Sequence, residues 1–253
     1  MISIETLEKL SRQYQAGIFP NIVREYFQHI FLSELYKLPT AEKLLFKGGT
    51  ALRIIYNSPR FSEDLDFSIF GVAPKEVKSF VEELFIQVLS EMDRAGIKVK
   101  LGDKIGATSG GYYGVATFQM FEYPPVDVEI NVSSRSGRNV IGEVDSITNN
   151  FVPTYTIIHL PQNDLVEEKI FGALLERKKP RDFYDLYLIM RKGMVSNEQK
   201  KKLSKTRDSI LANAKSINFR GELGTFLPMD QHQIIKDFPT MLERELDRQL
   251  GGI

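Results

Sequence analysis

Cysteine is absent from the 253 residues, so disulfide bonds and thiolate metal sites are excluded. Long apolar runs are also missing, since none approaches the roughly 18–20 residues that a helix needs to cross a bilayer. The N-terminal segment 1–14 carries acidic residues and lacks the apolar centre of a secretory signal. We therefore expect a cytoplasmic protein that does not associate with a membrane.

Excess charge of either sign is lacking too: the chain has 33 Lys and Arg against 33 Asp and Glu. The protein as a whole is thus not a basic nucleic-acid binder. The charges are unevenly spread, however, because residues 191–220 contain nine Lys or Arg and two Asp or Glu. This segment is either a contact for RNA phosphates or a solvated helix face.

Hydrophobic periodicity predicts an α+β fold. Apolar residues recur at helical spacing in three N-terminal segments, 3–15, 21–37 and 74–95. Alternating or short apolar runs predict strands at 43–47, 64–70, 97–101, 112–121, 126–133 and 154–160. The remainder reads as helical, with a break near Pro180. We expect an α/β domain with N-terminal helices over residues 1–160 and a helical domain over 161–253.

The stretch "DLDFSIF" places two carboxylates on one face of a strand. Side chains alternate between faces, so Asp64 and Asp66 project together, away from Leu65. Two close carboxylates repel each other unless they are solvated or neutralised by cations, and Mg²⁺ prefers such oxygen ligands together with water and phosphate. A third acid can come from the strand "VDVEIN", where we favour Glu129 over Asp127.

A glycine turn precedes these acids. Gly48 and Gly49 separate a short apolar strand from a short helix with Thr50 near its start. Glycines allow close approach of a phosphate to the backbone, and the first amides of a helix favour anions. The turn matches neither the dinucleotide fingerprint nor the P-loop, so a plain strand-to-helix turn is the alternative.

The segments "FKGGTALRIIY" and "RFSEDLDFS" resemble the AbiEii-type nucleotidyltransferases, which are toxins of type IV toxin–antitoxin and abortive-infection systems. The stretch "EEKIFGALLERKKPRDFYDLYLI" resembles the downstream motif of the same family. The resemblance covers roughly residues 25–190 and leaves the last sixty residues unmatched. It implies a polymerase-β-like nucleotidyltransferase core, a small mixed sheet with flanking helices, followed by a helical region.

The resemblance also implies roles for individual residues. Asp64 and Asp66 would be the metal-binding acids, and Gly48, Gly49, Thr50 and Lys169 would bind the nucleotide. The residues themselves add Glu129 as a third ligand of two Mg²⁺ ions, with Mn²⁺ as a possible substitute, and Arg60 as a further contact of the nucleotide. Lys169 and Asp182 would act in catalysis beside Asp64 and Asp66, whereas an ion pair between Lys169 and Asp182 is the structural alternative.

The implied reaction transfers a nucleotidyl group from an NTP to an RNA, with the 3′ end of tRNA as the favoured acceptor. A cognate antitoxin would be encoded separately. Two alternatives stay open from the sequence: nucleotidylation of a protein hydroxyl, and a non-catalytic module that binds nucleotide or RNA. Among other residues, Arg53 and Arg60 either bind phosphate or form structural pairs, while Tyr112 and Tyr113 either stack on a base or pack in a strand.

Overall fold

The computed structural model describes residues 2–16, 18–102, 106–108, 110–135 and 140–251. The chain divides into two compact units. Unit 1 comprises Met1–Asn57 and Phe61–Leu160, and unit 2 comprises Ser58–Arg60 and Pro161–Ile253. A three-residue segment between the glycine turn and the acidic strand therefore belongs with the helical unit.

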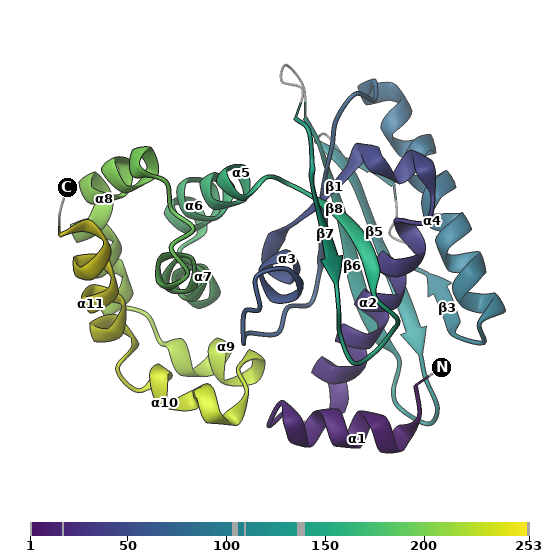
Figure 1. Cartoon of the computed structure of the whole chain (residues 1–253), viewed down its shortest axis with the longest axis horizontal. Helices are drawn as coiled ribbons and strands as arrows, with labels where there is room; N and C mark the ends of the chain where they lie inside the picture. The colour runs from purple at the N-terminus through teal and green to yellow at the C-terminus, as the bar shows by residue number, and fades with distance from the viewer. Residues whose placement is uncertain (1, 17, 103–105, 109, 136–139, 252–253) are drawn as a thin grey trace. The chain divides into compact units, whose positions relative to one another are not determined.

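Unit 1 is built on a mixed eight-stranded sheet in the order β3-β5-β6-β2-β1-β8-β7, with β4 paired to β5 (Figure 1). The strands are β1 (Leu44–Lys47), β2 (Leu65–Ile69), β3 (Lys98–Leu101), β4 (Gly106–Thr108), β5 (Gly111–Gln119), β6 (Val126–Ser134), β7 (Glu143–Ile147) and β8 (Tyr155–His159). The pairs β1–β8 and β2–β6 are parallel, and the other pairs are antiparallel. The α+β class is confirmed, but the sheet is larger than expected because β4 and β7 lack the apolar alternation that marks a strand.

The helices of unit 1 are α1 (Ile4–Gln13), α2 (Val23–Leu35), α3 (Gly48–Ile54) and α4 (Val77–Arg94), with a kinked segment at Ile18–Ile22, in which Phe19 is non-helical, and 3-10 turns at Pro39–Lys43 and Pro74–Glu76. α2 and α4 pack against each other and against β6 and β5 (Figure 1). Their aromatic residues build the core: Phe27 stacks on Phe118 with ring centroids 4.8 Å apart, and Phe31 meets Phe85 edge to face. This packing fixes the sheet from which the acidic side chains project.

Unit 2 is helical. It contains α5 (Gln162–Glu167), a π-helical segment (Glu168–Leu174), α6 (Leu175–Arg177), α7 (Pro180–Arg191), α8 (Asn197–Lys215), α9 (Phe219–Phe226), a 3-10 turn (Met229–Gln231), α10 (His232–Ile235) and α11 (Phe238–Leu250). The predicted break before Pro180 is confirmed, since Lys178 adopts a left-handed conformation and Pro180 opens α7. α11 packs against α7 and α8, and α9 packs against α7. In the described part of the chain, no helix has the length and apolar character of a membrane span.

Candidate active site

The acidic strand β2 presents its carboxylates as its sequence predicts. Leu65 and Phe67 are fully buried, whereas Asp64 and Asp66 are partly exposed on the other face. β2 lies inside the sheet between β1 and β6, so its backbone is held on both sides. Asp66 therefore projects from a rigid support, and Asp64 directly precedes this strand.

Gly48 leaves room for one of these carboxylates. Its φ of +85° lies in the left-handed region, and a Cβ built on it would stand 2.2 Å from Asp66 Oδ2. Any side chain here would collide with the carboxylate as well as strain the backbone. The glycine turn and the acidic strand, expected to form two parts of one site, are thus in direct contact.

Thr50 holds the backbone of the other acid, Asp64. Thr50 is fully buried, and its Oγ1 donates a hydrogen bond to the backbone carbonyl of Asp64. This hydroxyl, which we predicted to contact a phosphate, bonds to the backbone of the residue that directly precedes β2. Lys47 directly precedes α3 and makes no side-chain capping hydrogen bond to the first amides of that helix.

Glu129 lies beside the acidic strand. Residues 126–134 of β6 alternate between buried apolar and more exposed polar side chains, and Leu65 pairs with Ile130 in parallel register. Extending this register by one residue sets Glu129 next to Asp64. Asp127 lies further along the strand, where its Oδ1 accepts a hydrogen bond of 2.6 Å from Thr117.

Tyr113 on β5 lies on this face. The sequence predicts that it either stacks on a base or packs in a strand. Its hydroxyl is hydrogen bonded to Glu129. Desolvation, followed by the negative charges of Glu129, Asp64 and Asp127, raises the pKa of Tyr113. Tyr112, one residue earlier, points to the opposite face and is buried against Phe85. Strand parity alone separates the two tyrosines.

Carboxylate oxygens from Asp64, Asp66 and Glu129 are the donors that Mg²⁺ prefers. Within the described ranges, however, no three Asp, Glu or His residues are grouped so that they could hold a metal ion. Mg²⁺ often takes only one or two protein carboxylates and completes its shell with water and substrate phosphates, so Asp64 and Asp66 alone have the chemistry that an ion bound to a nucleotide needs.

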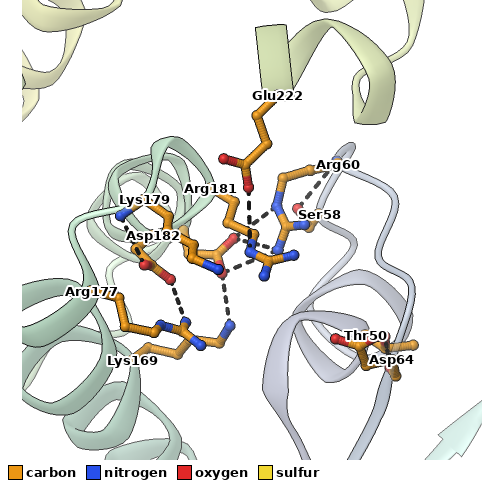
Figure 2. Close-up of polar contacts among 11 residues, drawn as sticks. Thr50, Ser58, Arg60, Asp64, Lys169, Arg177, Lys179, Arg181, Asp182 and Glu222 are labelled. Carbon is orange, nitrogen blue, oxygen red and sulfur yellow. Dashed lines mark hydrogen bonds and ion pairs between the residues drawn. The ribbon is translucent and has the colours of Figure 1, made fainter. Parts of the chain in front are cut away.

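Unit 2 contains a buried ion-pair cluster formed by Arg60, Lys169 and Asp185. Lys169 and Arg60 both bond to the carboxylate of Asp185, and Figure 2 shows the side chains of these two cations. Lys169 Nζ lies 2.8 Å from Asp185 Oδ2, and Arg60 donates from Nε and Nη2 at 3.1 and 2.9 Å to Oδ1. Burial opposes ionisation of Asp185, but the two cations outweigh it and hold its pKa below the usual value.

Arg60, which we predicted to bind the nucleotide, belongs to the ion-pair cluster with Asp185. Its side chain is only 3% exposed and is bonded to Asp185. Arg53, the other arginine near the acids, forms a two-pronged pair with Glu25 and stacks on Phe61. Both arginines are thus in structural pairs, the alternative left open by the sequence.

Asp182 is likewise engaged in structure. Its carboxylate accepts hydrogen bonds from Arg177 at 2.6 Å and from the Lys179 backbone amide at 3.2 Å, so it caps the first turn of α7 (Figure 2). Lys169 contacts Asp185 rather than Asp182, which differs from the ion pair considered as the structural alternative. The residue that orients Lys169 is therefore Asp185, three positions further along α7.

Comparison with solved structures identifies the fold. Two crystal structures from Helicobacter pylori are similar. One, described as that of a candidate nucleotidyltransferase, has 18% sequence identity and a TM-score of 0.65, and the match covers 92% of this chain and 96% of that one. The other, JHP933, has 17% identity and a TM-score of 0.56, with 100% and 97% covered. Among curated proteins, none matches this chain.

Comparison with protein families matches residues 30–249 to the family described as "Nucleotidyl transferase AbiEii toxin, Type IV TA system". The match includes the glycine turn, the acidic strand and the cluster around Lys169. This chain therefore belongs to the AbiEii family, the nucleotidyltransferase toxins of type IV toxin–antitoxin systems.

Proposed function

We propose that this nucleotidyltransferase transfers a nucleotidyl group from an NTP to a hydroxyl of an RNA, with the 3′ end of tRNA as the favoured acceptor. The observation that supports this most directly is the pairing of Gly48 with Asp66 on the carboxylate face of β2. It joins a backbone turn suited to phosphate with acids suited to metal, in a chain of the AbiEii family. RNA as acceptor follows from the resemblance and is part of the proposal.

Asp64 and Asp66 would hold two Mg²⁺ ions, with Glu129 as a further ligand; Mn²⁺ is a possible substitute. When bound, such ions neutralise the phosphates and stabilise the charge that develops in an in-line displacement. The backbone of Gly48 and Gly49 would face the nucleotide phosphates. Thr50 would act indirectly, because its hydroxyl braces the carbonyl of Asp64.

In the proposed reaction, the acceptor oxygen forms a bond to the α-phosphorus of the NTP. The bond from that phosphorus to the bridging oxygen breaks, and pyrophosphate leaves. The acceptor's proton passes to Glu129, or to Asp127 in its place. Lys169 is bonded to Asp185 within unit 2, and its ammonium would contribute positive charge to the triphosphate. The protein would act in the cytoplasm and arrest growth of the cell. A separately encoded antitoxin would relieve this arrest.

A labelling experiment tests the proposal. The purified protein is incubated with Mg²⁺, each of the four α-labelled NTPs and total tRNA, and the label is followed into RNA and protein. We expect labelled RNA from the wild type, and loss of labelling with EDTA or with Asp66→Asn. Asp93→Asn, which removes an exposed acid from α4 of the same unit, should leave labelling unchanged. Label on protein alone, or none at all, would contradict the proposal.

A further inference from the structure

A pocket of unit 2 includes the end of the basic segment 191–220 and residues that follow it. It lies between α9, α10 and the start of α11 and has a volume of about 790 Å³. This is within the usual range for pockets that hold a small molecule or a single nucleotide. Its polar lining includes Arg220, Lys236 and His232, and its apolar lining includes Ile217, Ile235 and Pro239.

The two cations of this pocket form no ion pair within the part of unit 2 that the structure describes. Among the described residues of unit 2, no carboxylate oxygen of an Asp or Glu lies within 4.0 Å, the limit for an ion pair, of a side-chain nitrogen of Arg220 or Lys236. Glu222, the acid nearest to Arg220 along the chain, is instead paired with Arg181 at 3.3 Å (Figure 2). Two positive charges at one concave site attract an anion, and phosphate is the common anion that both side chains recognise.

His232 adds a directional group. Its Nε2 lies 3.0 Å from the carbonyl oxygen of Leu227, which can only accept, so Nε2 carries the hydrogen. In the neutral ring, Nδ1 is then a hydrogen-bond acceptor. A ribose 2′-hydroxyl is a donor that distinguishes RNA from DNA. The pocket thus combines two cations, one acceptor and an apolar wall.

We propose that this pocket binds one nucleotide of the RNA acceptor. Arg220 and Lys236 hold the phosphate, His232 accepts from the 2′-hydroxyl, and the base lies against the apolar wall. The inference rests on the proposed function in that the bound chain is the acceptor RNA. It adds a binding site in the C-terminal part, where the sequence carries no motif.

Binding is measured without catalysis, in EDTA and without NTP. The probes are tRNA, a labelled single-stranded RNA of roughly 12 nucleotides and the DNA of the same sequence. The double variant Arg220→Gln/Lys236→Gln should bind RNA about tenfold more weakly near 0.15 M salt, and the slope of log affinity against log salt should fall by about 1.4. His232→Phe should reduce the preference for RNA over DNA.

The matched control is Lys201→Gln/Lys205→Gln, which removes the same charge from the exposed side of α8. It should lose less affinity than the pocket variant. Equal losses in both pairs would mean diffuse attraction, and an unchanged pocket variant would mean no site; either result would overturn the inference. The proposed function and the proposed RNA pocket can fail separately. If the wild type transfers no nucleotide but binds RNA through Arg220, the proposed function is wrong and the RNA pocket stands. If the pocket variant labels RNA with an unchanged KM for RNA, the RNA pocket is wrong and the proposed function stands.

Discussion

Gly48 lies so close to Asp66 that a Cβ built on the glycine would stand 2.2 Å from Asp66 Oδ2. The two residues come from different elements, the start of α3 and the middle of β2. The carboxylate can hold its place only because position 48 has no side chain. One glycine therefore serves both the backbone turn and the position of an acid in the candidate active site.

Substitution of Gly48 by alanine tests this relationship. We expect Gly48→Ala to displace the Asp66 carboxylate and to lower nucleotidyl transfer by at least about tenfold, the effect of a misplaced catalytic group. Gly71→Ala is the matched control. Gly71 also has a left-handed φ, +67°, but no heavy atom lies within 4 Å of its Cβ position. Both variants should lose about 1 kcal/mol of stability from the backbone strain, and only the first should lose activity.

Outcomes of this pair are read from steady-state rates and from urea denaturation. Equal activities of the two variants would show that the position of Asp66 tolerates the collision. A displaced metal site would additionally appear as a higher Mg²⁺ concentration for half-maximal rate in Gly48→Ala, because the change acts on the carboxylate rather than on the acceptor.

The third acid can be identified by comparing Glu129→Gln with Asp127→Asn. Register sets Glu129 beside Asp64, and Tyr113 binds it, whereas Asp127 is bonded to Thr117. We expect Glu129→Gln to lower the rate by about 10²–10³-fold, as the loss of a group acting in the transition state does, and Asp127→Asn to have a much smaller effect. Tyr113→Phe, which removes one hydrogen bond to Glu129, should fall between them. A greater loss in Asp127→Asn would reverse the assignment.

Much of the fold follows from local patterns. The buried side of α4, including Val77, Val81, Leu84 and Val88, has the spacing that predicts a helix, and β6 has the alternation that predicts a strand. β7 was not predicted because it is an edge strand with exposed Glu143, Val144, Asp145 and Ser146, so its sequence shows no buried face. It is a strand because its backbone pairs with β8.

In the candidate site, the sequence predicts only relations between residues that are close together along the chain. Asp64 and Asp66 share a face because they are two residues apart on one strand, a relation that holds in any fold. Arg60 and Asp185 are 125 residues apart, and no periodicity relates them. The contact of Gly48 with Asp66 and the bond from Thr50 to the Asp64 carbonyl also depend on how α3 and β2 pack, so the sequence pointed to these residues but not to what each one contacts.

Asp185 should be needed for the stability of unit 2 at neutral pH. Asp185→Asn leaves the buried cation of Arg60 without its counter-charge, which costs about 3–5 kcal/mol. Because the folded-state pKa is depressed, the contribution is complete above the unfolded value of about 3.9 and is lost as the pH falls through the folded-state value. The gap between wild type and variant in urea denaturation should therefore be full at pH 7 and narrow below about pH 4.

Asp208→Asn is the control for Asp185, since Asp208 is 95% exposed in its pair with Arg207. It should change the free energy of unfolding by less than about 0.5 kcal/mol. If the Asp185→Asn variant were as stable as this control, the cluster would have no role in holding unit 2 together.

His29 should make unit 1 sensitive to a different pH range. Its ring is buried, stacks on Phe151, and lies 2.9 Å from the Tyr155 hydroxyl. Burial, with a smaller effect from the charge of Arg53, lowers its pKa to about 3, so the folded protein holds it neutral. The unfolded chain binds a proton below its ordinary value of about 6.5, so stability is full above that pH and falls as the pH drops toward the folded-state value.

Between pH 6.5 and 5.5 this proton linkage amounts to about 1 kcal/mol. His29→Gln keeps a polar group toward Tyr155 but cannot titrate. Over the same interval, the free energy of unfolding of the variant should therefore fall by about 1 kcal/mol less than that of the wild type. Urea denaturation followed by circular dichroism at the two pH values measures the difference, and hydrogen exchange in peptides of α2 locates it in unit 1. Asp185 titrates only at lower pH, so an identical decline in the two proteins would mean that His29 is charged in the folded state.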